Sequence, residues 1–382
     1  MTPADVLDLP DFPWDSLAPF KARASSHVGG LVDLSVGTPV DPTPPSVQEA
    51  LRAAADAPGY PQTWGTADLR EAVATWFAAR RGVERVDPGG VLPTIGSKEL
   101  VAWLPTLLGL GPGDIVAFPR AAYPTYDVGA RLAGATPQPV DSLTALGPLT
   151  PSTTPKLLWL NSPSNPTGKV LGIEHLAKVV GWARRHGVVV ASDECYAELD
   201  WRARDPAAQR EPPTTPSILD PRVTGGSHEG LLCVYSLSKQ SNLAGYRAAF
   251  VAGDPALVKR LLEVRKHAGM MMPWPVQRAM IAALADETHV IAQKATYAAR
   301  RAKLMAGVTA YGLRIDDSEA GLYLWASADE DCWTTLGRLA DLGLLAAPGA
   351  FYGTAGARHV RIALTASDER IAAAAARLAG AA

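Results

Sequence analysis

Short apolar runs that end in polar side chains recur along this chain and predict strands that are buried on both faces. They cover residues 91–95 (a strand or a loop), 114–119, 156–161, 187–192, 231–235 and 248–252. Segments with apolar residues on one face lie between these runs and predict helices, at residues 46–57, 68–80, 100–108, 174–186 and 255–267. Strands that alternate with helices favour a mostly parallel α/β sheet.

The pattern changes at residues 270–275, where a methionine-rich segment with two prolines interrupts it. We place the boundary between two domains there. One long helix is expected from about residue 276 to residue 311. The remaining pattern predicts a strand at 321–325, a helix at 333–342, strands or loops at 344–348 and 359–364, and an alanine-rich terminal helix.

The composition is that of an ordinary globular protein, with 47% hydrophobic and 19% charged residues among 382. Lys and Arg total 36 against 38 Asp and Glu, so the charge balance points neither to nucleic acid nor to an anionic membrane. The first residues lack the pattern of a signal peptide, and the apolar stretch at 100–110 is too short to span a bilayer. Cys195, Cys233 and Cys332 are far apart in the sequence, and we expect buried free thiols. These features predict a cytoplasmic protein.

A lysine between two predicted strands is the most informative single residue. Lys239 follows the apolar run at 231–235, and Ser236, Ser238 and Arg247 stand near it in the sequence. Desolvation and a cationic neighbour lower the pKa of a lysine and make its amine nucleophilic toward carbonyls. Hydroxyls and a guanidinium are groups that bind phosphate. The stretch therefore predicts a cofactor with an aldehyde and a phosphate, held as a Schiff base by Lys239, and pyridoxal phosphate (PLP) has both groups.

Two alternatives stay open for this stretch. A lysine after a strand is most often a solvated turn residue. Residues 236–239 also match the S-x-x-K motif of acylating serine enzymes, although the chain lacks the S-D-N and K-T-G motifs that accompany it. The serine also closes a predicted strand, whereas the acylating serine opens a helix.

Polar side chains with the chemistry that this cofactor needs follow other predicted strands. Asn165 lies in a proline-rich turn after the strand at 156–161, and Asp193 and Tyr196 follow the strand at 187–192. A buried aspartate needs a partner, and a protonated pyridine nitrogen is a good one. A metal is the alternative, but none of the 7 histidines has ligand spacing to Asp193 or to another histidine. Because ligands bind at the carboxyl ends of strands in open α/β sheets, we expect these side chains to converge.

The other candidates carry weaker signals when taken singly. Gly96, Ser97 and Lys98 precede a predicted helix and form either a phosphate site or a plain helix cap. Tyr123 follows the strand at 114–119 and stacks either on a planar cofactor or in the core. Arg361 alternates with apolar residues on a strand, which predicts either an ion pair or a ligand for a carboxylate.

Together these motifs resemble the class I/II aminotransferases, which have PLP-dependent transferase fold type I. The motifs are Ser-Pro-Ser-Asn-Pro-Thr-Gly at 162–168, Asp-Glu-Cys-Tyr at 193–196, and Ser-x-Ser-Lys at 236–239 continued by Gly-Tyr-Arg at 245–247. The resemblance runs from about residue 35 to the C-terminus and implies a homodimer. It implies a mostly parallel seven-stranded sheet with helices on both faces, plus a smaller α/β C-terminal domain. The chain would divide into an N-terminal arm with part of the small domain (1–45), a large PLP-binding domain (46–275) and a small C-terminal domain (276–382).

The resemblance also implies a role for each candidate. Lys239 would bind the cofactor and shuttle the proton, Asp193 would hold the pyridine nitrogen, and Tyr196 would bind the ring oxygen with Asn165. Cofactor binding would further involve Gly96, Ser97, Lys98, Tyr123, Ser236, Ser238 and Arg247, with Tyr60 reaching the phosphate of the neighbouring subunit. Substrate would be bound by Gly37, Asn165 and Arg361, the last through the α-carboxylate.

A narrower resemblance concerns the substrate. Residues 235–247, together with Lys-His-Ala-Gly-Met-Met-Met at 266–272, are similar to the actinobacterial succinyldiaminopimelate aminotransferases. The reaction implied is N-succinyl-2-amino-6-oxopimelate plus glutamate, giving N-succinyl-diaminopimelate and 2-oxoglutarate in lysine and cell-wall biosynthesis. Trp274 stands where such enzymes often have glycine or alanine. The same residues would also serve an aminotransferase for aspartate or another amino acid, or a PLP-dependent carbon–sulfur lyase. A ligand sensor fused to a DNA-binding module is the non-enzyme alternative, but the chain has no spare basic N-terminal domain.

Overall fold

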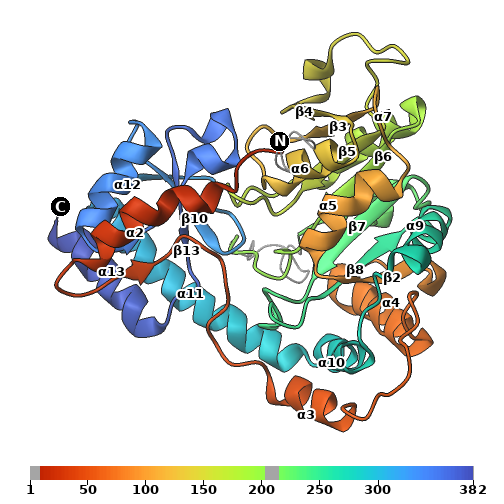
Figure 1. Cartoon of the computed structure of the whole chain (residues 1–382), viewed down its shortest axis with the longest axis horizontal. Helices are drawn as coiled ribbons and strands as arrows, with labels where there is room; N and C mark the ends of the chain where they lie inside the picture. Colours follow the sequence, from red (N-terminus) through yellow and green to blue (C-terminus); the bar gives the residue numbers. More distant parts are fainter. Residues whose placement is uncertain (1–8, 203–214, 382) are drawn as a thin grey trace, which may run out of the picture.

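The computed structural model describes residues 9–202 and 215–381. Its largest element is a seven-stranded sheet in the order β2-β8-β7-β6-β5-β3-β4 (Figure 1). The strands are β2 (Val91–Ile95), β3 (Ile115–Phe118), β4 (Thr136–Pro139), β5 (Leu157–Asn161), β6 (Val189–Asp193), β7 (Leu231–Ser236) and β8 (Ala248–Gly253). Within this sheet β8 runs antiparallel to both its neighbours, and the other pairs are parallel. The predicted mostly parallel α/β sheet is confirmed.

Helices cover both faces of this sheet because its central strands are apolar on both sides. Strands β5, β7 and β8 are buried along their whole length. One face packs against α4 (Ala67–Arg81), α7 (Ile173–His186) and α10 (Trp274–Ala285), and α10 in turn contacts α3 (Pro45–Ala53). The other face packs against α5 (Ser97–Leu107), α6 (Thr125–Leu132) and α9 (Pro255–Ala268).

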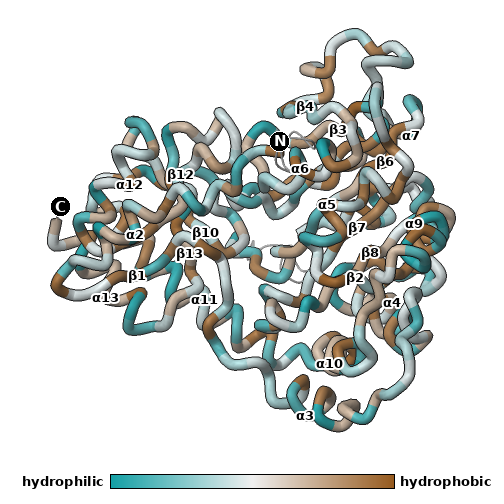
Figure 2. Tube along the Cα trace, in the orientation of Figure 1, coloured by the Kyte–Doolittle hydropathy of each residue, from teal (hydrophilic) through white to brown (hydrophobic). Residues whose placement is uncertain are grey.

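A second, smaller sheet is antiparallel, in the order β12-β13-β10-β9. Its strands are β9 (Arg314–Asp316), β10 (Tyr323–Ser327), β12 (Ala347–Pro348) and β13 (Val360–Ala363), and it shares an apolar core with α11 (Glu287–Ala310), α12 (Cys332–Asp341) and α13 (Asp368–Gly380). The N-terminal segment joins this part of the fold: α2 (Ala18–Ser25) contacts α12, and β1 (Val32–Asp33) pairs in parallel with β11 (Leu344–Leu345). Figure 2 shows brown, apolar stretches running through the interior of both parts. The chain division at residues 45 and 275 stays a prediction.

The expected single helix from residue 276 to 311 is wrong. Helix α10 ends at Ala285 and α11 begins at Glu287, with Asp286 between them in an extended conformation (φ −105°, ψ 96°). The Asp286 carboxylate accepts a hydrogen bond from the Thr288 N–H at 3.0 Å and so caps α11. Apolar residues continue on both sides of Asp286, which is why periodicity alone did not reveal the break.

Shorter elements complete the described chain. They are α8 (Pro221–Thr224) and 3₁₀ helices at Pro13–Leu17, Pro88–Gly90, Leu143–Leu146, Gly349–Tyr352 and Thr354–Gly356. The three cysteines are buried and free, as predicted. None of the described helices combines the length and apolarity needed to cross a membrane.

Candidate active site

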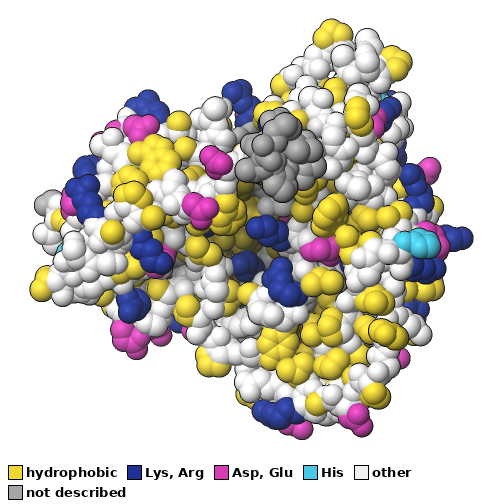
Figure 3. All heavy atoms as spheres, viewed as in Figure 1, with side chains coloured by type: hydrophobic (Ala, Val, Ile, Leu, Met, Phe, Trp, Pro, Cys, Tyr) yellow, Lys and Arg dark blue, Asp and Glu magenta, His cyan; other side chains and the backbone are white. Residues whose placement is uncertain are grey.

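The two sheets face each other across a cavity of about 500 Å³. Its walls come from the carboxyl ends of strands in the large sheet, from β10 and β13 of the small sheet, and from N-terminal segments around residues 12–14 and 36–38. Figure 3 shows Lys and Arg side chains gathered in a hollow near the middle of the view, between the two halves of the molecule. The cavity therefore brings together segments that are far apart in the sequence.

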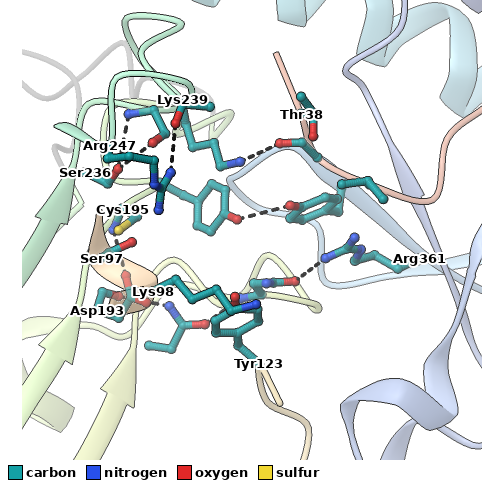
Figure 4. Close-up of a pocket in the computed structure, with 18 of the residues that line it drawn as sticks. Thr38, Ser97, Lys98, Tyr123, Asp193, Cys195, Ser236, Lys239, Arg247 and Arg361 are labelled. Carbon is teal, nitrogen blue, oxygen red and sulfur yellow. Dashed lines mark hydrogen bonds between the residues drawn. The ribbon is translucent and has the colours of Figure 1, made fainter. Parts of the chain in front are cut away.

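Strand β7 and the turn after it supply one wall (Figure 4). Ser236 ends the strand; its hydroxyl donates to the Ser238 hydroxyl at 2.8 Å and accepts from the Ser238 N–H at 3.2 Å. The ammonium of Lys239 donates to the Gly37 carbonyl, across the cavity. The guanidinium of Arg247 donates to the Ala244 carbonyl at 2.8 Å. The turn thus places two hydroxyls and two cations at one end of the cavity.

Strand β6 supplies a buried acid. Asp193 lies opposite Asn161 in the parallel register of β6 and β5. Its carboxylate accepts from the Tyr126 hydroxyl at 3.0 Å and from the Cys195 N–H at 3.2 Å. Burial raises the pKa of Asp193 above the ordinary value of an aspartate, although these hydrogen bonds oppose the shift. No cation pairs with this carboxylate among the described residues, so a protonated ligand nitrogen would be a favourable partner.

The proline-rich turn after β5 is held by an amide network. Asn161 donates to the Pro163 carbonyl at 3.1 Å and to the Asp193 carbonyl at 2.9 Å, and it accepts from the Asn165 N–H at 2.7 Å. These bonds fix the Asn165 side chain at the cavity. Its amide oxygen accepts from Arg361 at 2.9 Å.

Arg361 lies on β13 and is 3% exposed. Its guanidinium donates to Asn165 Oδ1 and, at 2.7 Å, to the Ser35 carbonyl, while its Nε has no partner in the described part of the chain. A buried guanidinium without a carboxylate partner is unfavourable unless a ligand supplies one. Arg361 forms no ion pair with any described residue, so a role as ligand for a carboxylate fits it better than a structural ion pair does.

Most of the predicted residues line this cavity. They are Gly37, Ser97, Lys98, Tyr123, Asn165, Asp193, Tyr196, Ser236, Ser238, Lys239, Arg247 and Arg361. Gly96 lies just behind them, next to Arg247. Tyr60 is 96% exposed and lies outside the cavity. The roles predicted for these residues stay predictions, while their convergence is a property of the fold.

A phosphorylated aldehyde cofactor fits this set of groups. Gly96 has φ +81°, and a Cβ there would lie 2.0 Å from Nη2 of Arg247, so only glycine lets the backbone and the guanidinium come this close. No side chain caps the N-terminus of α5, which leaves its first N–H groups free for an anion. The Ser236 and Ser97 hydroxyls line the same cavity. The buried acid Asp193 and the amine of Lys239 supply the partners for a ring nitrogen and an aldehyde.

Several lining residues carried no sequence signal that singled them out. Phe12 and Trp14 come from the proline-rich N-terminal segment, whose irregular pattern predicted little. Tyr323 also lines the cavity, and its hydroxyl oxygen lies 3.1 Å from that of Tyr196. Trp274 opens α10 and is not among the residues that line the cavity in the described part of the chain.

Comparisons with known proteins agree with this geometry. Residues 30–378 match the family model "Aminotransferase class I and II". The chain is 58% identical over 371 residues to the 4-dedimethylamino-4-oxo-anhydrotetracycline transaminase OxyQ of Streptomyces rimosus, covering 97% of this chain and 99% of OxyQ. It is 59% identical over 370 residues to a probable aminotransferase of Mycobacterium tuberculosis, covering 97% of this chain and 85% of that protein.

Among solved structures, one described as a probable N-succinyldiaminopimelate aminotransferase from Thermus thermophilus superposes with a TM-score of 0.83 at 30% identity. The alignment covers 97% of this chain and 100% of that chain. The large sheet, the small sheet and the cavity between them therefore belong to a known arrangement.

Proposed function

The chain belongs to the class I and II aminotransferases, and from that premise we propose that it transfers an amino group from glutamate to N-succinyl-2-amino-6-oxopimelate. The products would be N-succinyl-diaminopimelate and 2-oxoglutarate. Pyridoxal phosphate is the cofactor of this family, and when bound it supplies an electron-withdrawing ring. The observation that carries the choice of substrate is the charge of the cavity.

Cations outnumber acids among the residues that line the cavity. Among the described residues that line it, Lys98, Lys239, Arg247 and Arg361 face a single acid, Asp193. In our proposal Arg247 is taken up by the cofactor phosphate, Arg361 by the substrate α-carboxylate, and Lys239 by the chemistry. Lys98 then remains for another anion.

Lys98 lies toward the mouth of the cavity. Its ammonium is 5.5 Å from the centroid of the Phe12 ring, and no described acid forms an ion pair with it. We propose that this ammonium attracts the distal carboxylates of a succinylated substrate, in addition to the cofactor role predicted for Lys98. A substrate with a free distal ammonium would meet repulsion here, and no lining acid near Lys98 would compensate it.

The groups around the reacting atoms have separable roles in this proposal. Asp193 would keep the ring nitrogen of the bound cofactor protonated, and Asn165 and Tyr196 would hold its ring oxygen. Lys239 moves the proton at the substrate α-carbon, which requires its amine to stay close to that atom. The Gly37 carbonyl, which accepts from Lys239, keeps that amine on the substrate side of the cavity.

Absorption spectroscopy tests the proposal directly. Purified protein with added PLP should show a visible band, and N-succinyl-L,L-diaminopimelate should convert it to the shorter-wavelength band of the amine form. Lys239→Ala should give no covalent adduct on borohydride reduction. A wild-type protein without a visible band would refute the cofactor site, and a band that responds to other amino acids but not to this one would refute the substrate.

The substrate charge has its own matched comparison. L,L-Diaminopimelate differs from the proposed product by carrying a free distal ammonium in place of the succinyl group. We expect Lys98→Met to raise the KM for the succinylated compound by about tenfold, the loss of one charge-assisted interaction, and to leave the KM for unsubstituted L,L-diaminopimelate unchanged or lower. Equal KM changes for both compounds would refute the role of Lys98.

A second candidate substrate is an oxo compound of the kind named for OxyQ, 4-dedimethylamino-4-oxo-anhydrotetracycline. Two observations favour it: the 58% identity to OxyQ, and the aromatic wall formed by Phe12 and Trp14, whose ring centroids lie 5.6 Å apart. Comparison of kcat/KM for the two amino acceptors decides between them. The lyase alternative would show itself by release of a thiol from a sulfur-containing amino acid without any amino acceptor.

We also propose that the protein is a homodimer. The almost complete exposure of Tyr60 is what a side chain reserved for a neighbouring subunit would show. A cytoplasmic location stays a prediction. Sedimentation equilibrium of the wild-type protein tests whether it is a homodimer.

A further inference from the structure

Tyr323 lines the candidate site, although no role was predicted for it from the sequence. Tyr323 begins β10 of the small sheet and is buried. Its hydroxyl oxygen lies 3.1 Å from that of Tyr196, and the two rings meet edge to face at 5.7 Å. Because Tyr196 follows β6 of the large sheet, this contact bridges the two sheets across the cavity.

Gly37 leaves room for this hydroxyl. A Cβ at position 37 would lie 2.1 Å from the Tyr323 hydroxyl oxygen and 2.8 Å from Cζ. Such distances are not found between real atoms, so any larger residue at position 37 would displace the phenol. The Gly37 carbonyl also accepts from Lys239, so the same short segment fixes the tyrosine and the lysine.

The ring of Tyr323 supports Arg361. The guanidinium carbon lies 3.8 Å from the ring centroid, within the range of a cation–π contact. The two residues come from the antiparallel pair β10 and β13, in which Trp325 is opposite Arg361 and Tyr323 is opposite Ala363. The ring therefore holds the face of the guanidinium while its edge is left for Asn165, Ser35 and a ligand.

The direction of the hydrogen bond between the two tyrosines follows from their surroundings. Burial raises the pKa of Tyr196, and the nearby Tyr323 raises it further. Burial opposes ionisation of Tyr323 as well, but Arg361 and Lys239 hold its pKa below the ordinary value of a tyrosine. The 3.1 Å contact allows either hydroxyl to donate. A hydroxyl has a single proton, so if Tyr196 donates to the ring oxygen of the cofactor, Tyr323 must be the donor in this contact and Tyr196 the acceptor.

Other titratable groups also face this pair. The titratable and charged side chains that interact with Tyr323 are those of Tyr123, Cys195, Tyr196, Lys239, Tyr297, Tyr352 and Arg361. Arg361 and Lys239 are the cations of this set, and both stabilise negative charge on the Tyr323 oxygen.

We propose that Tyr323 is a positioning residue that acts through Tyr196 and Arg361. Its hydroxyl donates to Tyr196, which leaves the Tyr196 proton available for the ring oxygen of the cofactor, and its ring holds Arg361 for the substrate carboxylate. This inference rests on the proposed aminotransferase function. It predicts that the two halves of the side chain have separate, measurable effects.

The pH dependence of the visible cofactor absorption tests the hydroxyl. A proton donated to the ring oxygen stabilises negative charge there and so favours the deprotonated lysine–cofactor linkage. In Tyr323→Phe the hydroxyl of Tyr196 loses its donor and becomes a weaker donor itself. We expect the spectroscopic midpoint of the holoenzyme to move to higher pH, in the same direction as in Tyr196→Phe but by less.

Kinetics separate the hydroxyl from the ring. Tyr323→Phe keeps the ring, so we expect an unchanged KM for the amino substrate and a kcat lowered by about three- to tenfold. Tyr323→Leu also removes the nearer of two rings that contact Arg361, since the Tyr352 ring remains with its centroid 4.9 Å from the guanidinium carbon. We expect the KM to rise by about tenfold, the effect of a buried cation–π contact.

Gly37→Ala provides an independent variant that leaves the tyrosine in place. The added carbon should displace the phenol, so both the upward shift of the midpoint and the higher KM are expected. Gly380→Ala is the matched control, because a Cβ there meets nothing within 4 Å. The test can be carried out if at least one of the two variants, Tyr323→Phe or Gly37→Ala, folds correctly.

The outcomes are distinguishable from failure of the proposed function. A midpoint that stays unchanged or falls in Tyr323→Phe, with wild-type kcat, would overturn the role of the hydroxyl. A KM that rises equally in Tyr323→Phe and Tyr323→Leu would overturn the role of the ring. A wild-type protein without a visible band in the presence of PLP would instead overturn the aminotransferase proposal itself.

Discussion

An ion pair buried beneath the candidate site gives a stability prediction that can be worked out from the structure. Arg81, in the last turn of α4, is 3% exposed, and Glu194 is completely buried directly after Asp193. One guanidinium nitrogen of Arg81 lies 2.7 Å from Glu194 Oε2 and 3.2 Å from the Thr215 carbonyl oxygen. The other carboxylate oxygen accepts from the Ile218 N–H at 2.7 Å.

Replacement of Arg81 by methionine keeps the apolar stem and removes the charge. It leaves the Glu194 carboxylate in the core with the Ile218 N–H as its remaining donor. Breaking a buried pair from one side typically destabilises a protein by about 3–5 kcal/mol. Because the Ile218 bond is retained, we expect a loss near the lower limit, about 3 kcal/mol in the free energy of unfolding.

The double variant Arg81→Met with Glu194→Gln removes both charges. Its glutamine oxygen can still accept from Ile218, and two further nitrogens of Arg81 that have no partner in the described part of the chain disappear as well. Replacing a whole buried pair is often neutral. We therefore expect the double variant to lose less than about 1.5 kcal/mol and to be more stable than Arg81→Met alone.

Urea unfolding followed by tryptophan fluorescence measures these differences. Protein and PLP concentrations must be equal for all variants, because ligand binding and association both shift apparent stability. Arg52→Met is the matched control: Arg52 pairs with Glu49 on the surface of α3, with 64% of its side chain exposed, and should lose less than about 1 kcal/mol. A loss below about 1 kcal/mol for Arg81→Met, or a double variant less stable than the single one, would refute the reasoning.

Three further predictions concern the cavity. Burial raises the pKa of Asp193 in the folded protein above its unfolded-state value, so the ionised carboxylate destabilises the cofactor-free fold increasingly as pH rises from the unfolded-state pKa to the folded-state pKa. Asp193→Asn should therefore raise the Tm of the cofactor-free protein at neutral pH, and this gain should disappear below about pH 4. The same substitution should abolish most transamination by the holoenzyme. Gly96→Ala should weaken PLP binding by at least about tenfold in a fluorescence titration because the new carbon would lie 2.0 Å from Arg247, whereas Gly82→Ala, with a similar positive φ of +65° but open space around it, should lose stability and retain PLP affinity. Arg361→Met should raise the KM for the amino substrate by about 30- to 100-fold, the loss of a charged double hydrogen bond, while leaving the visible cofactor band in place; a KM within threefold of wild type would contradict the carboxylate role.

The positions of most strands along the chain and the chemistry at their ends could be predicted from the sequence. Apolar runs long enough for one strand each, with polar residues directly after them, predicted both the parallel sheet and the edge where Asp193, Asn165 and Lys239 would meet. This inference works because the carboxyl ends of neighbouring parallel strands lie at the same edge of a sheet. The convergence of the strand-end groups could therefore be predicted without knowledge of contacts between distant segments.

What the sequence could not show depends on contacts between segments far apart in the chain. The break at Asp286 lies between two segments of helical periodicity, where an aspartate can be either a surface residue of one helix or the cap of a second; α10 packs on α3 and α4, and Asp286 caps α11. Tyr323 looked like one more residue of a strand, because nothing local indicates that its hydroxyl would meet Tyr196 and fill the space beside Gly37. Local patterns determine which elements form and which side chains stand at their ends. The docking of the two sheets decides which of those side chains touch, since that docking is set by the summed packing of cores that no short stretch of sequence contains.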